Sequence, residues 1–255
     1  MPRIVLLLLA LGAPAFAADS ISVPMPRLAL DDLFSEEGAV DVAVSPSGRY
    51  LSAIVRTRDA DVLVLFDIKT SEHKAVTKVG RKDIGSRYDA YMSTIYWKSD
   101  DLMLFRVEID HAKNAKVKDF TSGDFRRLGN RLFSITRDGK TVTRMLADNR
   151  NSELAWALDL GAIRSLMPRD PEHILMVVDG MDGRSLFKVN VRTGLGEVMI
   201  HADPDIVDWW LDLEGKPVVQ VEVSRGYLRF YRHDDGKKWK LYYKVRLREL
   251  KDEND

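Results

Sequence analysis

The feature that most constrains this chain is a repeated pattern of short strands between residues 40 and 245. Each repeat has a strand, a tight polar turn, a strongly apolar strand, a mixed strand, a glycine turn and a last strand. Short runs of β-branched, aromatic and aliphatic residues bounded by turn residues are typical of β-strands. Helical periodicity is largely absent from this range, so the pattern predicts an all-β fold.

The spacing of the repeats indicates which all-β architecture to expect. Comparable first turns lie at Gly48, Asp100, Pro171 and Gly215, at separations of 52, 71 and 44 residues. A propeller blade of four antiparallel strands takes roughly 40 to 50 residues, and inserted loops explain the longer interval. We therefore expect β-propeller-type repeats, with about four four-stranded blades in a partial or small propeller.

The strand boundaries follow from the same pattern. The first repeat is expected at 40–44, 50–55 and 62–67, ending near 75–76, and the second at 94–97, 102–107, 132–135 and 141–146. The third is expected to begin at 165–167, and the fourth to end with a strand at 239–245. The turn Ser45-Pro46-Ser47-Gly48 combines the fixed φ of proline with a glycine that adopts positive φ freely.

Composition excludes several classes of protein. The chain has 39 basic and 39 acidic residues, so its net charge gives no general attraction to nucleic acid or anionic lipid. It contains no cysteine, which excludes disulfides, thiolate metal sites and cysteine nucleophiles. Its 45% hydrophobic content is that of a folded domain.

The N-terminus has the pattern of an export signal. Arg3 precedes the apolar run 4–11, and Ala15-Phe16-Ala17 places small residues at the usual cleavage positions. We therefore expect a cleavable signal peptide at 1–17 and a soluble product, most simply in a bacterial periplasm. The remaining organisation is expected as a linker with a short helix at 18–39, propeller blades at 40–245 and a charged tail at 246–255.

One segment within the repeats is a candidate for partner contact. Residues 112–131 interrupt the second repeat and carry six basic residues against Asp119 and Asp124. The candidate contacts are Lys113, Lys116, Arg126 and Arg127, either in a solvated loop or against a peptide or protein partner. Phe120 and Phe125 also suggest a single-stranded nucleic acid, which the export signal argues against.

The search for catalytic and metal-binding motifs predicts none. The nearest approach to Gly-x-Ser-x-Gly is 183–187, where Phe187 replaces the second glycine, and we interpret it as a turn entering a strand. The groups at 179–183 and 201–205 contain aspartates that could hold a metal, but aspartate and glycine are also favoured in turns. We expect no catalytic residue, no metal site and no cofactor.

Several of these motifs resemble a known family. The stretch Val42-Ala-Val-Ser-Pro-Ser-Gly-Arg-Tyr-Leu51 resembles the first-blade motif of the N-terminal propeller in bacterial prolyl oligopeptidase family serine peptidases of the acylaminoacyl-peptidase and dipeptidyl aminopeptidase type. Residues 166–175 and 187–194 are similar to a later blade, and 207–215 with 229–232 to the next. The resemblance covers 30–231, and TolB-like exported propellers share its Ser-Pro-x-Gly turn.

The resemblance implies a function. In that family the propeller restricts substrate access to an α/β-hydrolase domain, which has no counterpart in this chain. We therefore expect a truncated, exported propeller segment related to the gating domain and lacking hydrolytic activity alone. The alternative is a free-standing TolB-like periplasmic scaffold that binds a protein or peptide. Open propeller edges would also permit self-association.

Overall fold

The fold is described here from a computed structural model of the chain. The structure describes residues 38–80, 88–111, 129–147, 154, 157, 159–234 and 238–250. The predicted signal peptide, the short helix of the linker and the four candidate contacts Lys113, Lys116, Arg126 and Arg127 lie outside the described residues.

The first sheet is an antiparallel meander in which each strand pairs with the next. Its strands are β1 (Gly38–Val44), β2 (Tyr50–Arg56), β3 (Ala60–Asp67) and β4 (His73–Gly80). The predicted turn between β1 and β2 is present. Gly48 adopts a φ of +73°, and its N–H donates to the carbonyl of Ser45 at 2.8 Å.

The second sheet repeats the meander and adds a strand that the sequence pattern did not indicate. Its strands are β5 (Tyr88–Ser99), β6 (Leu102–His111), β7 (Asn130–Thr136), β8 (Val142–Arg144) and β9 (Asp159–Leu160). β9 is two residues long and pairs with β7 in parallel. Such a short strand has no periodicity to read, and its position depends on side-chain contacts of Asp159 described below.

The third sheet is again a four-stranded antiparallel meander. Its strands are β10 (Ile163–Ser165), β11 (His173–Gly180), β12 (Gly183–Asn190) and β13 (Gly196–Asp203).

The predicted ends of two strands, β8 and β10, are wrong. Residues 165–167 were predicted as a strand, but the strand ends at Ser165 because Met167 adopts a φ of +46°. Residues 141–146 were predicted as a strand, but β8 ends at Arg144, and Leu146 has a φ of +56°. Positive φ ends a regular strand, and no propensity of Met or Leu indicates it.

The fourth sheet is the last along the described chain. Its strands are β14 (Ile206–Leu211), β15 (Pro217–Ser224), β16 (Tyr227–Asp234) and β17 (Lys238–Arg246), followed by a short 3-10 helix at Leu247–Leu250. The predicted charged tail therefore begins within β17 at Arg246 and continues as one helical turn.

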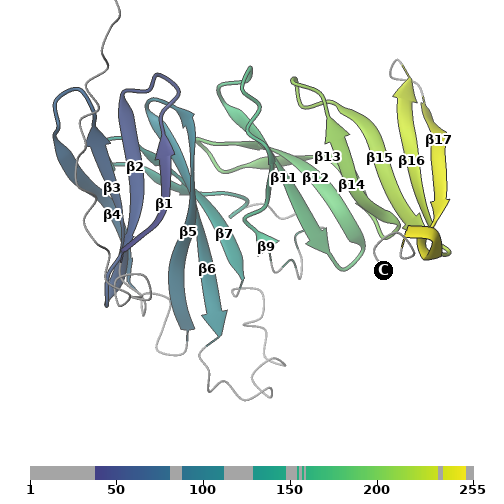
Figure 1. Cartoon of the computed structure of the whole chain (residues 1–255), viewed down its shortest axis with the longest axis horizontal. Coiled ribbons are helices and arrows are strands. Elements are labelled where there is room, and N and C mark those ends of the chain that lie inside the picture. The colour runs from purple at the N-terminus through teal and green to yellow at the C-terminus, as the bar shows by residue number, and fades with distance from the viewer. Residues whose placement is uncertain are drawn as a thin grey trace, which may run out of the picture. The chain divides into compact units, whose positions relative to one another are not determined.

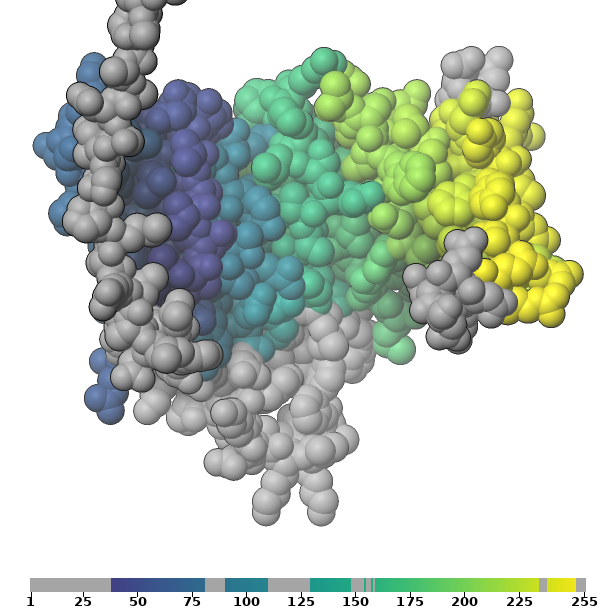
Figure 2. All heavy atoms as spheres, in the orientation of Figure 1, coloured from purple at the N-terminus to yellow at the C-terminus, as the bar shows by residue number. Residues whose placement is uncertain are grey.

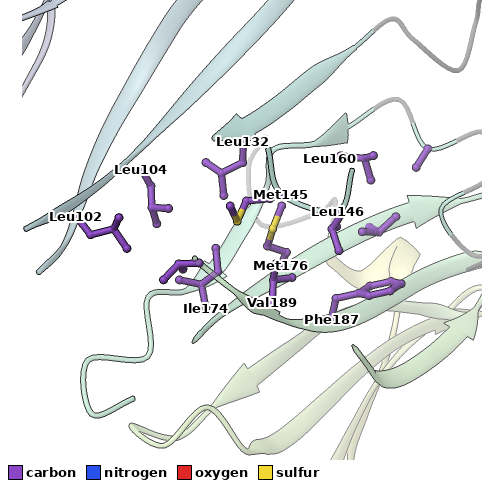
Figure 3. Close-up of a cluster of buried hydrophobic side chains, with 13 residues drawn as sticks. Leu102, Leu104, Leu132, Met145, Leu146, Leu160, Ile174, Met176, Phe187 and Val189 are labelled. Atoms are coloured by element: carbon purple, nitrogen blue, oxygen red, sulfur yellow. The ribbon is translucent and has the colours of Figure 1, made fainter. Parts of the chain in front are cut away.

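The core consists of the contacts between successive sheets. Because side chains alternate between the two faces of a strand, β6 directs Met103 and Phe105 toward the first sheet and Leu102 and Leu104 toward the third. Figure 3 shows the cluster between the second and third sheets, including Leu102, Leu104 and Leu132 from one side and Ile174, Met176 and Phe187 from the other. A smaller cluster joins the third and fourth sheets around Trp209.

The architecture is therefore the predicted one: an all-β fold of propeller-type repeats. Four sheets, each built on a four-stranded antiparallel meander, follow one another in chain order, and the second sheet also holds β9. Figure 1 shows this order from purple to yellow. In the space-filling view the teal atoms of the second sheet lie directly against the green atoms of the third (Figure 2). Within the part of the chain that the structure describes, no helix is long and apolar enough to cross a bilayer.

Candidate binding cleft

A polar cleft of about 410 Å³ lies where the first and second sheets meet. We call it the Arg56–Glu108 cleft. Its described lining residues come from β1, β2, β5, β6 and β7, and are Val40, Arg56, Tyr91, Ser93, Glu108, Ile109 and Asn130. Residues from five strands meet there because the ends of β2 and β6 lie beside the middle of β5.

Arg56 is held rigidly on one wall of the cleft. Its guanidinium donates to both carboxylate oxygens of Asp61, at 2.9 and 3.1 Å, and to the carbonyl of Met92 at 3.2 Å. The same guanidinium lies 5.3 Å from the ring centroid of Tyr91, a cation–π distance. Three strands, β2, β3 and β5, thus hold this guanidinium, and the carboxylate of Asp61 is its ion-pair partner.

Asp61 is the buried centre of this arrangement. Its side chain has 0% exposure, and besides Arg56 it accepts the backbone N–H of Met92 at 2.8 Å. A buried carboxylate is tolerated only when it is paired and hydrogen-bonded. The alternation of β3 places Asp61 on the same inward face as Leu63 and Leu65, and a charged residue in an otherwise apolar row is the signal that sequence reasoning missed.

Asp159 is not among the described lining residues, but it anchors one of them, Asn130. Its carboxylate accepts from Arg106 Nη2 at 2.8 Å, from Asn130 Nδ2 at 3.3 Å and from the N–H of Gly161 at 2.7 Å. These contacts position β9 and also orient Asn130 at the cleft. Arg106 Nε lies 3.8 Å from the carboxylate of Glu108.

The cleft retains hydrogen-bonding groups that the protein does not fully use. Among the described residues, Ser93 Oγ is buried and has no hydrogen-bond partner. The Glu108 side chain is 49% exposed and reaches Arg106 only at 3.8 Å. The amide of Asn130 and the ring of Tyr91 also line the cleft. No histidine is among the described lining residues, so Ser93 has no imidazole base beside it there.

The predicted turn interpretations can be checked directly. Residues 183–187 form the start of β12, and Ser185 is fully buried and donates to the carbonyl of Val178 at 3.3 Å. The pentapeptide is thus the beginning of a strand, and the turn expected within it lies just before it, at residues 181–182.

The two aspartate groups also take part in local contacts. Asp179 accepts from Arg184 Nε at 2.6 Å and from Nη2 at 2.9 Å. Asp203 accepts the N–H of Asp205 at 2.8 Å, which is turn chemistry. Among the residues that the structure describes, no three His, Cys, Asp or Glu side chains gather as a metal site would require.

A second charged cluster, around Asp170, supports the fold. The carboxylate accepts from the backbone N–H groups of Glu172 and His173, at 3.0 and 3.1 Å, and contacts His173 Nδ1 and Lys188 Nζ at 3.0 Å. Partial desolvation opposes ionisation, but the hydrogen bonds from Lys188 and His173 outweigh it and lower the pKa of Asp170. The cluster fixes the turn that precedes β11.

Comparison with known proteins gives structural likeness only. No family model and no curated protein sequence matches the chain. The chain is similar to TolB from Acinetobacter baumannii, with 12% identity over 84% of this chain and 42% of that one, and a TM-score of 0.41. It is similar to an oligogalacturonate lyase in complex with manganese, with 16% identity, coverage of 80% and 52%, and a TM-score of 0.46.

A third similar structure is a puromycin-hydrolyzing peptidase of Mycobacterium tuberculosis, with 10% identity, coverage of 81% of this chain and 29% of that chain, and a TM-score of 0.41. The chain therefore spans about half or less of the length of each of these three proteins.

Proposed function

We propose that this chain is a propeller-type binding scaffold that takes an extended peptide or protein segment at the Arg56–Glu108 cleft, without hydrolytic activity of its own. The observation that carries the proposal is the fixed polar wall of the cleft. Arg56 and Asn130 are held in place by Asp61 and Asp159, while the half-exposed Glu108 carboxylate remains to meet a ligand.

An extended peptide suits this wall because its backbone presents N–H and C=O groups in alternation. Glu108 accepts a backbone or amino N–H, and the amide of Asn130 can donate to a carbonyl. The ring of Tyr91, held under Arg56, supplies a flat apolar surface for a side chain. Ligand sites generally combine such an apolar surface with a few oriented polar groups.

The biological setting of this activity follows from the sequence resemblance. As an exported segment related to the gating domain of a prolyl oligopeptidase-like peptidase, the chain would select peptides for a catalytic partner. As a free-standing TolB-like periplasmic scaffold, it would bind a peptide or protein segment without passing it to a hydrolase. Both settings require binding at the cleft, and they differ in whether a hydrolase acts on the bound peptide.

The binding test uses a pool of tryptic casein peptides passed over the immobilised 255-residue chain. Retained peptides are identified by mass spectrometry. We expect Glu108→Gln and Tyr91→Ala to reduce retention at least tenfold, whereas Tyr242→Ala, at a side chain that is 76% exposed on β17, leaves it unchanged. Equal retention by the wild type and both cleft variants, each with a native melting temperature, would exclude this cleft as the site.

Hydrolysis is tested separately with peptide p-nitroanilides. We expect no release of p-nitroaniline by the purified chain. Release that a serine-directed phosphonate blocks would contradict the non-hydrolytic part of the proposal and leave the binding part to the first test.

A further inference from the structure

Each sheet in the interior of the described chain is apolar on both faces. The second sheet packs Met103 and Phe105 against the first and Leu102 and Leu104 against the third. The third sheet packs Ile174 and Phe187 against the second, and Leu175 and Leu186 against Trp209 of the fourth. We call the face of a sheet that points toward the next sheet in chain order its forward face, and the other its rear face. Every contact between sheets then joins the forward face of one sheet to the rear face of the next.

The first sheet has a rear face that is apolar along β1, β2 and β3, while β4 adds His73, Ala75 and Lys78 to it. The register aligns Val42 with Ala53 and Val64, and Val44 with Leu51 and Phe66. Val55 and Val62 form the next row. None of these eight side chains belongs to a buried cluster of the described residues, and Val42 and Val44 are 50% and 55% exposed. We call these eight residues the first outer face.

The fourth sheet has the complementary forward face. It is opposite Trp209, and its apolar side chains are Trp210, Val219, Val221, Val223, Leu228, Phe230, Tyr243 and Val245, of which Val221 is buried. The register also places Arg232, beside Val219, and Lys240 on this face. Phe230 lies 5.9 Å from Trp210 and 6.0 Å from Tyr243, measured between ring centroids. Trp210 and Tyr243 are 51% and 56% exposed, and yellow atoms of this sheet lie at the surface in Figure 2. We call this set the second outer face.

We propose that the second outer face of one copy packs on the first outer face of a second copy, and that two such contacts join the copies as a dimer. The two faces are suited to each other because one is a forward face and the other a rear face. Forward and rear faces already pack together at the three contacts between successive sheets of the chain. The proposal does not depend on the binding function proposed above.

The contact area is sufficient for a stable pair. Strands lie about 4.8 Å apart and rise about 3.3 Å per residue, so a four-stranded face seven residues long covers on the order of 450 Å². Two contacts per copy then bury on the order of 900 Å² from each partner, close to the roughly 800 Å² of a standard interface.

The first experiment measures mass by light scattering during size exclusion of the full chain. We expect twice the 29.0 kDa of one chain. We expect Val64→Glu, on the first outer face, and Phe230→Glu, on the second, each to give a monomer with native circular dichroism. Met181→Glu, at a turn residue that is 75% exposed and belongs to neither face, should leave the dimer intact. A wild-type monomer at 10 to 100 µM would overturn the proposal.

The second experiment tests which faces meet in the dimer. It uses cysteine substitutions, which do not introduce the charge that a glutamate would place on either face. Because the chain has no cysteine, Val42→Cys and Trp210→Cys each introduce a single thiol. Val42 lies on β1 and Trp210 on β14, the first strands of their sheets. Within the chain, the first strands of the first and second sheets, β1 and β5, are in contact, so we expect β1 and β14 to lie close together between two copies. A bis-maleimide should cross-link a mixture of the two preparations at least tenfold more than either preparation alone. Cross-linking within either preparation alone at the level of the mixture would show like faces meeting, and would contradict the proposal.

Discussion

The carboxylate of Asp61 in β3 accepts the backbone N–H of Met92 in β5 at 2.8 Å, which ties the first sheet to the second with a fully buried charge. The same carboxylate holds Arg56 at the candidate cleft. One side chain therefore supports both the contact between two sheets and the wall on which the proposed binding depends.

Replacing Asp61 with alanine should destabilise the protein strongly. The change leaves the Arg56 guanidinium and the Met92 N–H without their partner, and breaking a buried ion pair on one side typically costs about 3–5 kcal/mol. Urea unfolding followed by circular dichroism measures the effect. Asp59→Ala, at an exposed residue of the preceding turn, should change the free energy of unfolding by less than about 0.5 kcal/mol. Similar effects of both changes would argue against the role of Asp61.

Two glycines with the same backbone conformation should differ sharply in their tolerance of alanine. Gly48 and Gly194 both have a φ of +73°. A Cβ at Gly48 meets nothing within 4 Å, whereas one at Gly194 would lie 2.3 Å from the carbonyl oxygen of Arg144. Gly48→Ala should cost about 1–2 kcal/mol for the left-handed backbone alone. Gly194→Ala should cost about 1–3 kcal/mol more because the second and third sheets must separate. Equal melting temperatures for the two variants would contradict this contact.

The contribution of Asp170 to stability should depend on pH. Hydrogen bonds from Lys188 and His173 outweigh partial desolvation and hold the pKa of Asp170 below the ordinary value of 3.8. Because the folded state favours the ionised form, this stabilisation is complete above about pH 5, and it is lost as pH falls through the lowered pKa. The melting temperature of Asp170→Asn should thus lie below that of the wild type at pH 7, and the gap should narrow toward pH 2. The exposed Asp182→Asn variant serves as the control, and a gap that is constant with pH would refute the prediction.

Phe187 should be the most costly truncation in the cluster between the second and third sheets. Its side chain is fully buried among the residues in Figure 3. Phe187→Ala should reduce the free energy of unfolding by about 3–5 kcal/mol, because it removes buried apolar area and leaves a cavity. Leu213→Ala, at a side chain that is 65% exposed, should cost less than about 0.5 kcal/mol. Chemical denaturation distinguishes these values, and a small loss for Phe187→Ala would show that the cluster is loosely packed.

Strand periodicity predicted most of the sheets because it is a local property. β2 alternates Tyr50, Ser52 and Ile54 inward with Leu51 and Ala53 outward, and such a row is readable without any partner. Tight turns were readable for the same reason, since Gly48 needs only its own φ. The errors at Met167 and Leu146 arose where a residue adopts positive φ. There the backbone is fixed by long-range contacts: Lys98 Nζ donates to the carbonyl of Met167 at 3.0 Å, and the N–H of Leu146 donates to the carbonyl of Gly194 at 2.7 Å.

The sequence by itself determined the all-β class and the four repeats, because both follow from short strand and turn patterns within about ten residues. Only the tertiary structure decided the position of β9, the pairing of Asp61 with Arg56 and Met92, and the group of side chains at the candidate cleft. Apart from the local pair of Arg56 and Asp61, these features join residues far apart in the chain: Asp61 and Met92 are 31 positions apart, and Arg106 and Asp159 are 53 positions apart. Their contacts depend on how one sheet stacks on the next, which no local pattern records.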